Sequence, residues 1–159
     1  MAKPITRDAL TIVDTPTYRM PPSVRARATY LALTLGTIAL GLAVHTSGAV
    51  LGAATRDVLG DALWAVMITW ALGTLVPDAR LPARGAVALA ICYGVEVSQL
   101  VHSPVLDAMR ATNAGRLMLG SGFDPRDLVA YSAGVLAAIL AERLVRSRRT
   151  VPATAPPAR

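Results

Sequence analysis

One acidic side chain is a clear candidate for chemistry, because it lies in the middle of a long apolar stretch. Glu96 is the only charged residue between positions 85 and 106. A carboxylate inside a membrane-spanning helix costs about 3 kcal/mol on insertion scales, so its presence suggests a function. Gln99 follows three residues later on the same helix face, and Tyr93 and His102 continue that face. This spacing predicts a polar site within an apolar domain.

Further charged side chains are expected at the same membrane level as Glu96. Carboxylates serve as general acids, general bases or ligands of divalent cations, whereas arginine forks match the geometry of phosphate. One hypothesis is a binding site for an anionic lipid head group. Its candidate residues are Glu96, Gln99, Arg110, Arg116, Asp127 and Tyr131, and Arg126 is an additional candidate. The other is an enzyme acting on a lipid-linked phosphate, with the catalytic candidates Glu96, Asp61 and Asp127.

These residues also have structural interpretations. Asp127 is suited to capping a helix N-terminus, and Asp61 is suited to an interfacial first turn. Glu96 would then pair with an arginine such as Arg110 and hold the helices together. Gln99 would join helices through hydrogen bonds. At the level of the sequence both interpretations stay open.

The composition indicates a small membrane protein. The chain has 159 residues, of which 53% are apolar and 16% are charged, and its mean hydropathy is +0.48. Soluble domains average about 25% charged residues. The hydrophobicity excludes a chain that is disordered throughout, the single cysteine, Cys92, excludes a disulfide scaffold, and the length excludes a large multidomain enzyme.

The elements that must position these residues are four apolar stretches, each near the length of about 20 residues that crosses a bilayer. Backbone groups in lipid must bond internally, so the spans are expected to be helices. A soluble four-helix bundle needs a polar face on each helix, which residues 30–44 and 63–76 lack. The expected fold is therefore all-α, an integral membrane bundle of four transmembrane helices at 28–46, 58–76, 83–101 and 127–145.

The basic residues are concentrated near both ends of the chain and predict its orientation. Positive-inside counting favours a multi-pass protein of the cell membrane with both termini cytoplasmic. Residues 1–27 and 146–159 are expected to be disordered basic tails around a membrane domain at 28–145. The long, proline-containing lead favours an uncleaved first span, although residues 47–49 resemble a signal-peptide cleavage site. Arginines beside apolar spans favour membrane lipids as partners and not nucleic acid.

The connection between the third and fourth spans is expected to be ordered. Ser103-Pro104 is typical of a helix start, with serine as N-cap and proline at the first helical position, and Gly115 is a natural stop. The pattern between them predicts a short interfacial or re-entrant helix. Asp124-Pro125 predicts a second cap, at the start of the fourth span.

Several kinds of site have no signature in this sequence. It contains no glycine-rich phosphate loop, zinc motif or nucleophile elbow, and neither His45 nor His102 has a partner at metal-ligand spacing. We therefore predict no cofactor and no metal site. A small-xxx-small pattern at Gly48 and Gly52 leaves a homo-oligomer open.

Several motifs taken together resemble the bacterial domain-of-unknown-function family 2809, over about residues 30–145. They are Gly-Asp-Ala-Leu-Trp at 60–64, Glu-Val-Ser-Gln at 96–99, Asp-Ala-Met-Arg-Ala-Thr at 107–112, Leu-Gly-Ser-Gly-Phe at 119–123 and Asp-Leu-Val-Ala-Tyr-Ser-Ala-Gly at 127–134. This family implies no settled activity.

More distantly, Glu96-x-x-Gln99, Phe123-Asp124-x-x-Asp127 and Gly134 are similar to the VanZ-like membrane family, which is associated with resistance to teicoplanin-type glycopeptides. That resemblance implies a role in cell-envelope maintenance or antibiotic tolerance. Tyr131 stands where VanZ-like proteins carry asparagine. The functions under consideration are therefore lipid binding first, an enzyme second, and a small transporter or scaffold subunit third.

Overall fold

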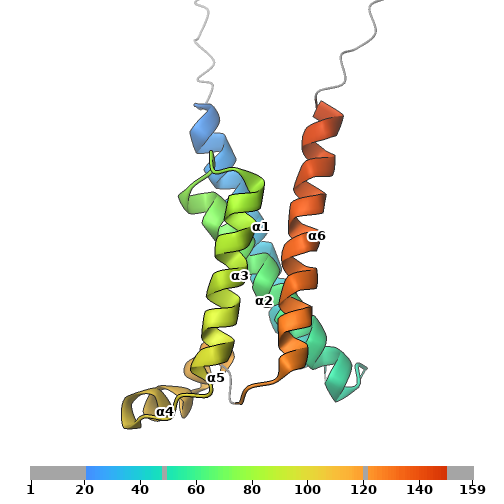
Figure 1. Cartoon of the computed structure of the whole chain (residues 1–159). Coiled ribbons are helices and arrows are strands. Elements are labelled where there is room, and N and C mark those ends of the chain that lie inside the picture. The colour runs from blue at the N-terminus through green and yellow to red at the C-terminus, as the bar shows by residue number, and fades with distance from the viewer. Residues whose placement is uncertain (1–20, 48–49, 120–121, 150–159) are drawn as a thin grey trace, which may run out of the picture.

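A computed structural model of the chain describes residues 21–47, 50–119 and 122–149, and these residues form helices without any strand. Four helices are long and two are short (Figure 1). The start of α1 and the end of α6 lie at one end of the bundle, and α4 and α5 lie at the other. The helices are α1 Pro22–Thr46, α2 Ala53–Leu75, α3 Leu81–Ser98, α4 Pro104–Arg110, α5 Asn113–Leu119 and α6 Pro125–Arg149.

The four long helices are each long and apolar enough to cross a membrane. The predicted all-α membrane bundle with four spans is thereby confirmed, and α4 and α5 occupy the place of the expected short helix between the third and fourth spans. An even number of spans returns the chain to its starting side, as the shared end of α1 and α6 illustrates.

The helix boundaries differ from those predicted. Residues 22–27 and 146–149, which were expected in the tails, are helical, and α2 begins at Ala53 instead of residue 58. Asp61 therefore lies two turns inside α2 and does not open it. Charged side chains end an apolar pattern but do not end a helix, because near the membrane surface they extend into water. The remaining tail residues, and two of the three residues of the cleavage-site motif, lie outside the described residues.

The connection to α6 contains two short helices where one was predicted. The hydroxyl of Ser103 accepts a hydrogen bond from the N–H of Leu106 at 3.3 Å, so the predicted N-cap of α4 is confirmed. The predicted stop at Gly115 is wrong, because Thr112 accepts from the Gly115 N–H at 2.9 Å and so caps a new helix. A Cβ on Gly115 would lie 1.8 Å from the carbonyl oxygen of Met109, which explains the glycine.

The central helix of the bundle is α2, which contacts α1, α3 and α6. Small residues let these helices approach closely, as is common where lipid removes the hydrophobic drive for packing. A Cβ on Gly134 of α6 would lie 2.2 Å from the carbonyl oxygen of Ala62 in α2. The buried core beside this crossing consists of Ala65, Ala88, Cys92, Tyr131 and Val135.

A buried ionic cluster joins α1, α3 and α6 at the end of the bundle opposite α4. Glu142 accepts hydrogen bonds from Tyr30, Arg84 and Arg146, and the Arg84 guanidinium also lies 4.7 Å from the centre of the Tyr30 ring. Tyr30 stacks on Trp70 of α2, with ring centres 6.2 Å apart. The sequence analysis did not identify this cluster, because Arg84 and Glu142 lie far apart in the chain, in different predicted spans.

The close crossing of α2 and α6 predicts different outcomes for two glycines. We expect Gly134→Ala to lower the free energy of unfolding by about 1–3 kcal/mol, since the added methyl overlaps the Ala62 carbonyl. Gly94→Ala is the matched control, because a Cβ there meets no atom within 4 Å. Thermal unfolding in detergent micelles measures both. Equal losses of stability in the two variants would contradict the crossing.

The ionic cluster predicts strong coupling between Arg84 and Glu142. We expect Glu142→Gln to cost about 3–5 kcal/mol, because it leaves the guanidinium of Arg84 buried without its counter-charge. Replacing Arg84 by Met in the same chain should recover part of that loss. A double-mutant cycle measured by chemical unfolding in micelles gives the coupling energy, and losses that simply add would refute it.

Candidate functional site

The side chain of Glu96 is fully buried, and its carboxylate is held by three donors from different segments. The Gln99 amide donates to Oε2 at 3.0 Å, and the Tyr131 hydroxyl donates to the same oxygen at 3.3 Å. The backbone N–H of Asp124 donates to Oε1 at 2.7 Å. The alternative in which Glu96 pairs with Arg110 is wrong, because Arg110 donates to the carbonyl oxygens of Ser98 and Val101 instead.

The start of α6 places further carboxyl groups near the Glu96 side chain. Asp124 caps the helix, as predicted, and its Oδ1 accepts from the N–H of Arg126 at 2.9 Å. Asp127 lies in the first turn. Its carboxyl group is within hydrogen-bond reach of Asp61 in α2. The structure therefore brings together Glu96 and all three of these aspartates.

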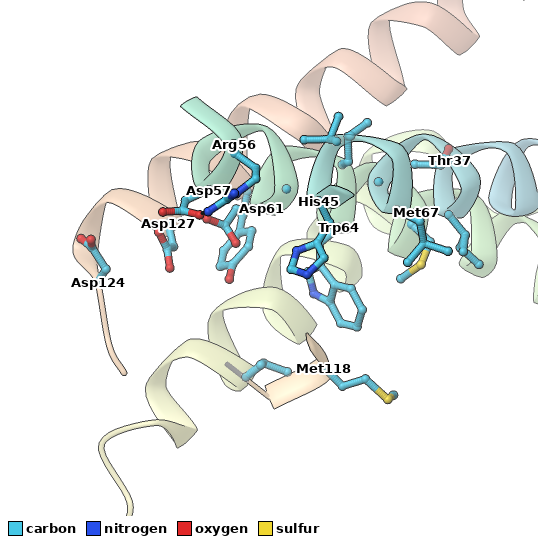
Figure 2. A pocket seen from close by; sticks show the side chains of 18 of the residues that line it. Thr37, His45, Arg56, Asp57, Asp61, Trp64, Met67, Met118, Asp124 and Asp127 are labelled. Carbon is cyan, nitrogen blue, oxygen red and sulfur yellow. The ribbon is translucent and has the colours of Figure 1, made fainter. Parts of the chain in front are cut away.

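A cleft of about 1130 Å³ opens beside this cluster, lined by residues of α1, α2, α3, α5 and α6. Figure 2 shows Asp57, Asp61, Asp124 and Asp127 toward one end of the cleft, with Arg56 beside Asp57 and Asp61. The lining also includes apolar side chains of α1 and α2, among them Ile38, Leu42, Val44, Leu63 and Met67. Met67 lies away from the aspartates, on the same side as Thr37 (Figure 2). The cleft is thus lined by both charged and apolar side chains.

One residue of the cleft lining has a buried polar atom that lacks a hydrogen-bond partner. Gln99 is 7% exposed, and its Oε1 is buried and unpaired. Its amide nitrogen is committed to Glu96, a carboxylate that only accepts hydrogen bonds when ionised. The orientation of the amide group is therefore determined, and the free oxygen can only accept.

The arginines of the proposed binding set are used differently. Arg110 donates to the carbonyl oxygens of Ser98 and Val101 at 2.7 and 3.0 Å. It thereby satisfies groups that the end of α3 leaves open, and it is absent from the described lining of the cleft. Arg116 belongs to α5, but its side chain lies outside the described part of the structure. Arg126 is exposed on the first turn of α6.

The structure adds Arg56, Asp57 and His45 to the cleft, none of which the sequence reasoning had selected. Arg56 and Asp57 were assigned to a loop before the second span, whereas they lie in the first turns of α2. Asp57 is four residues before Asp61, a spacing that places both on one helix face once the helix start is known. The Arg56–Asp57 pair is loose, with 4.0 Å between Nε and Oδ1 and side chains 32% and 69% exposed.

Comparison with known proteins identifies the family but no structural relative. No solved structure matches the chain. The family described as Protein of unknown function (DUF2809) matches residues 50–135, a range that contains Asp57, Asp61, Glu96, Asp124, Asp127 and Tyr131. Since this match covers more than half of the chain, the protein belongs to the DUF2809 family.

Proposed function

We propose that this protein binds a membrane lipid in the cleft, with the head group at the carboxylate end and hydrocarbon against the apolar side chains of α1 and α2. The observation that carries the proposal is the amphipathic lining of a cleft located among membrane-spanning helices. A lipid matches both parts of this lining, because its head group can contact the charged side chains and its hydrocarbon can contact the apolar ones.

Positive-inside counting assigns the carboxylate end to the outer leaflet. A lipid bound there would serve the role in cell-envelope maintenance or antibiotic tolerance that similarity to the VanZ-like family implies. The anionic head group expected from the sequence loses support, because Arg110 is used in capping α3. Arg56 is the arginine that the described lining offers to a phosphate, and it lies among carboxylates.

Filling the cleft tests lipid binding directly. Gly60 lines the cleft and its Cβ position is open, with no atom within 4 Å. We expect Gly60→Phe to abolish lipid retention while the protein stays folded, because the ring occupies the space of the head group. Native mass spectrometry of protein extracted from its own membrane measures retained lipid. Gly94→Phe is the matched control, being equally open but outside the cleft lining. Retention that is equal in both variants would reject the cleft as the site.

Catalysis is a second candidate function, favoured by one specific contact. The carboxyl groups of Asp61 and Asp127 approach within hydrogen-bond reach, and two carboxyl groups that share a proton can act as general acid and general base. In this alternative the pair would hydrolyse a lipid-linked phosphate, with Glu96 positioning Asp127 through the start of α6.

The enzyme alternative predicts turnover that depends on both aspartates. We expect Asp61→Asn and Asp127→Asn each to reduce phosphate release from a polyprenyl diphosphate in micelles by about 100-fold or more, the usual range for loss of acid–base catalysis. Asp78→Asn, at an exposed position between α2 and α3, should leave the rate unchanged. Absence of product with the wild-type protein, with and without divalent cations, would reject this alternative.

A further inference from the structure

We propose that the head group held in the cleft carries a primary ammonium, which donates to Asp61, Asp127 and the free oxygen of Gln99. This inference rests on the proposed lipid binding and specifies its chemistry. It predicts an amine-bearing lipid, such as an aminophospholipid, in place of the anionic lipid suggested by the sequence.

The charges that line the cleft are the first argument. Among the described side chains that line the cleft there are four carboxyl groups and one guanidinium, from Asp57, Asp61, Asp124, Asp127 and Arg56. That guanidinium is only loosely paired with Asp57, at 4.0 Å. Asp61 and Asp127, which are half-buried, lie within hydrogen-bond reach of each other. Two like charges at this separation repel strongly where water is scarce, so the pair either shares a proton or favours a ligand with positive charge.

The unpaired oxygen of Gln99 is an independent second argument. Gln99 is more than nine-tenths buried and lines the cleft, and its Oε1 lacks a hydrogen-bond partner. A buried acceptor without a donor costs about 1–3 kcal/mol. Since the oxygen can only accept, the complementary ligand group is a donor. A phosphate oxygen would leave this atom unsatisfied.

The number of donors distinguishes kinds of cation. A primary ammonium offers three N–H groups, enough for the two aspartates and Gln99. A quaternary ammonium has the same charge but offers none, so it could not satisfy the oxygen of Gln99. Arg56, which lines the same cleft beside Asp57 and Asp61 (Figure 2), would contact the phosphate that accompanies the amine in an aminophospholipid.

A methylation series tests the inference without altering the protein. The purified wild-type protein is incubated with vesicles of one acyl composition containing phosphatidylethanolamine, its mono- and dimethyl derivatives, phosphatidylcholine or phosphatidylglycerol. Retained lipid is then measured by native mass spectrometry. We expect retention to fall with each methyl group, by about tenfold from the first lipid to phosphatidylcholine, as loss of a charge-assisted hydrogen bond implies. A long-chain alkylamine, which has no phosphate, separates recognition of the amine from that of a phospholipid.

Variants identify the groups responsible. Asp61→Asn and Asp127→Asn should each remove the preference for phosphatidylethanolamine over phosphatidylcholine, whereas Asp78→Asn should preserve it. Gln99→Met, which deletes the acceptor, should reduce the same preference, and it serves as the second test if either asparagine variant fails to fold. A preference that survives in all three variants would overturn the assignment of these residues.

The outcomes separate this inference from the proposed function. If wild-type protein retains phosphatidylcholine or phosphatidylglycerol as well as it retains phosphatidylethanolamine, lipid binding stands and recognition of a primary ammonium is wrong. If it retains no lipid from any vesicle and none from its own membrane, both are wrong.

Discussion

The burial of Glu96 is the constraint on which the polar end of this bundle depends. A carboxylate removed from water costs several kcal/mol unless both oxygens find donors. Gln99 supplies one from the same helix, Tyr131 supplies another from α6, and the backbone of Asp124 supplies the third. Because Asp124 is also the N-cap of α6, the need to satisfy one carboxylate in α3 determines where α6 begins.

That placement has consequences along the whole of α6. Asp127 lies one turn beyond the cap and is thereby brought beside Asp61 of α2. Gly134 lies two turns further on, where the absence of a side chain lets α6 touch the backbone of α2. Near its other end the same helix supplies Glu142, which accepts from residues of α1 and α3. A buried carboxylate therefore organises each end of the bundle, and α6 takes part in both.

The sequence was sufficient for features that depend on one segment at a time. Apolar length predicted the four spans, and Ser103 and Asp124 were correctly predicted as caps, since a cap bonds to its own helix. The shared membrane level of Asp61, Glu96 and Asp127 followed from the predicted spans, but individual contacts between segments were not predictable. Nothing in the local pattern relates Arg84 to Glu142, because the two residues are 58 positions apart in the sequence. Likewise, a glycine at position 115 resembles a helix stop in the sequence. The reason for the glycine is the close approach of the Met109 carbonyl oxygen, which exists only in the folded arrangement of the two short helices.

Counting charges along the chain and locating them in space lead to opposite expectations for the ligand. The connection before α6 is rich in arginine, which favours an anion. Arg110, however, faces carbonyl groups at the end of α3, where the helix carries partial negative charge, so its charge is used within the fold. The carboxylates of the cleft carry like charges and therefore cannot neutralise one another. Asp61 and Asp127 come together without a buried basic partner described between them. Among the described side chains the charge of the cleft is therefore negative, which favours a bound proton or a cationic ligand.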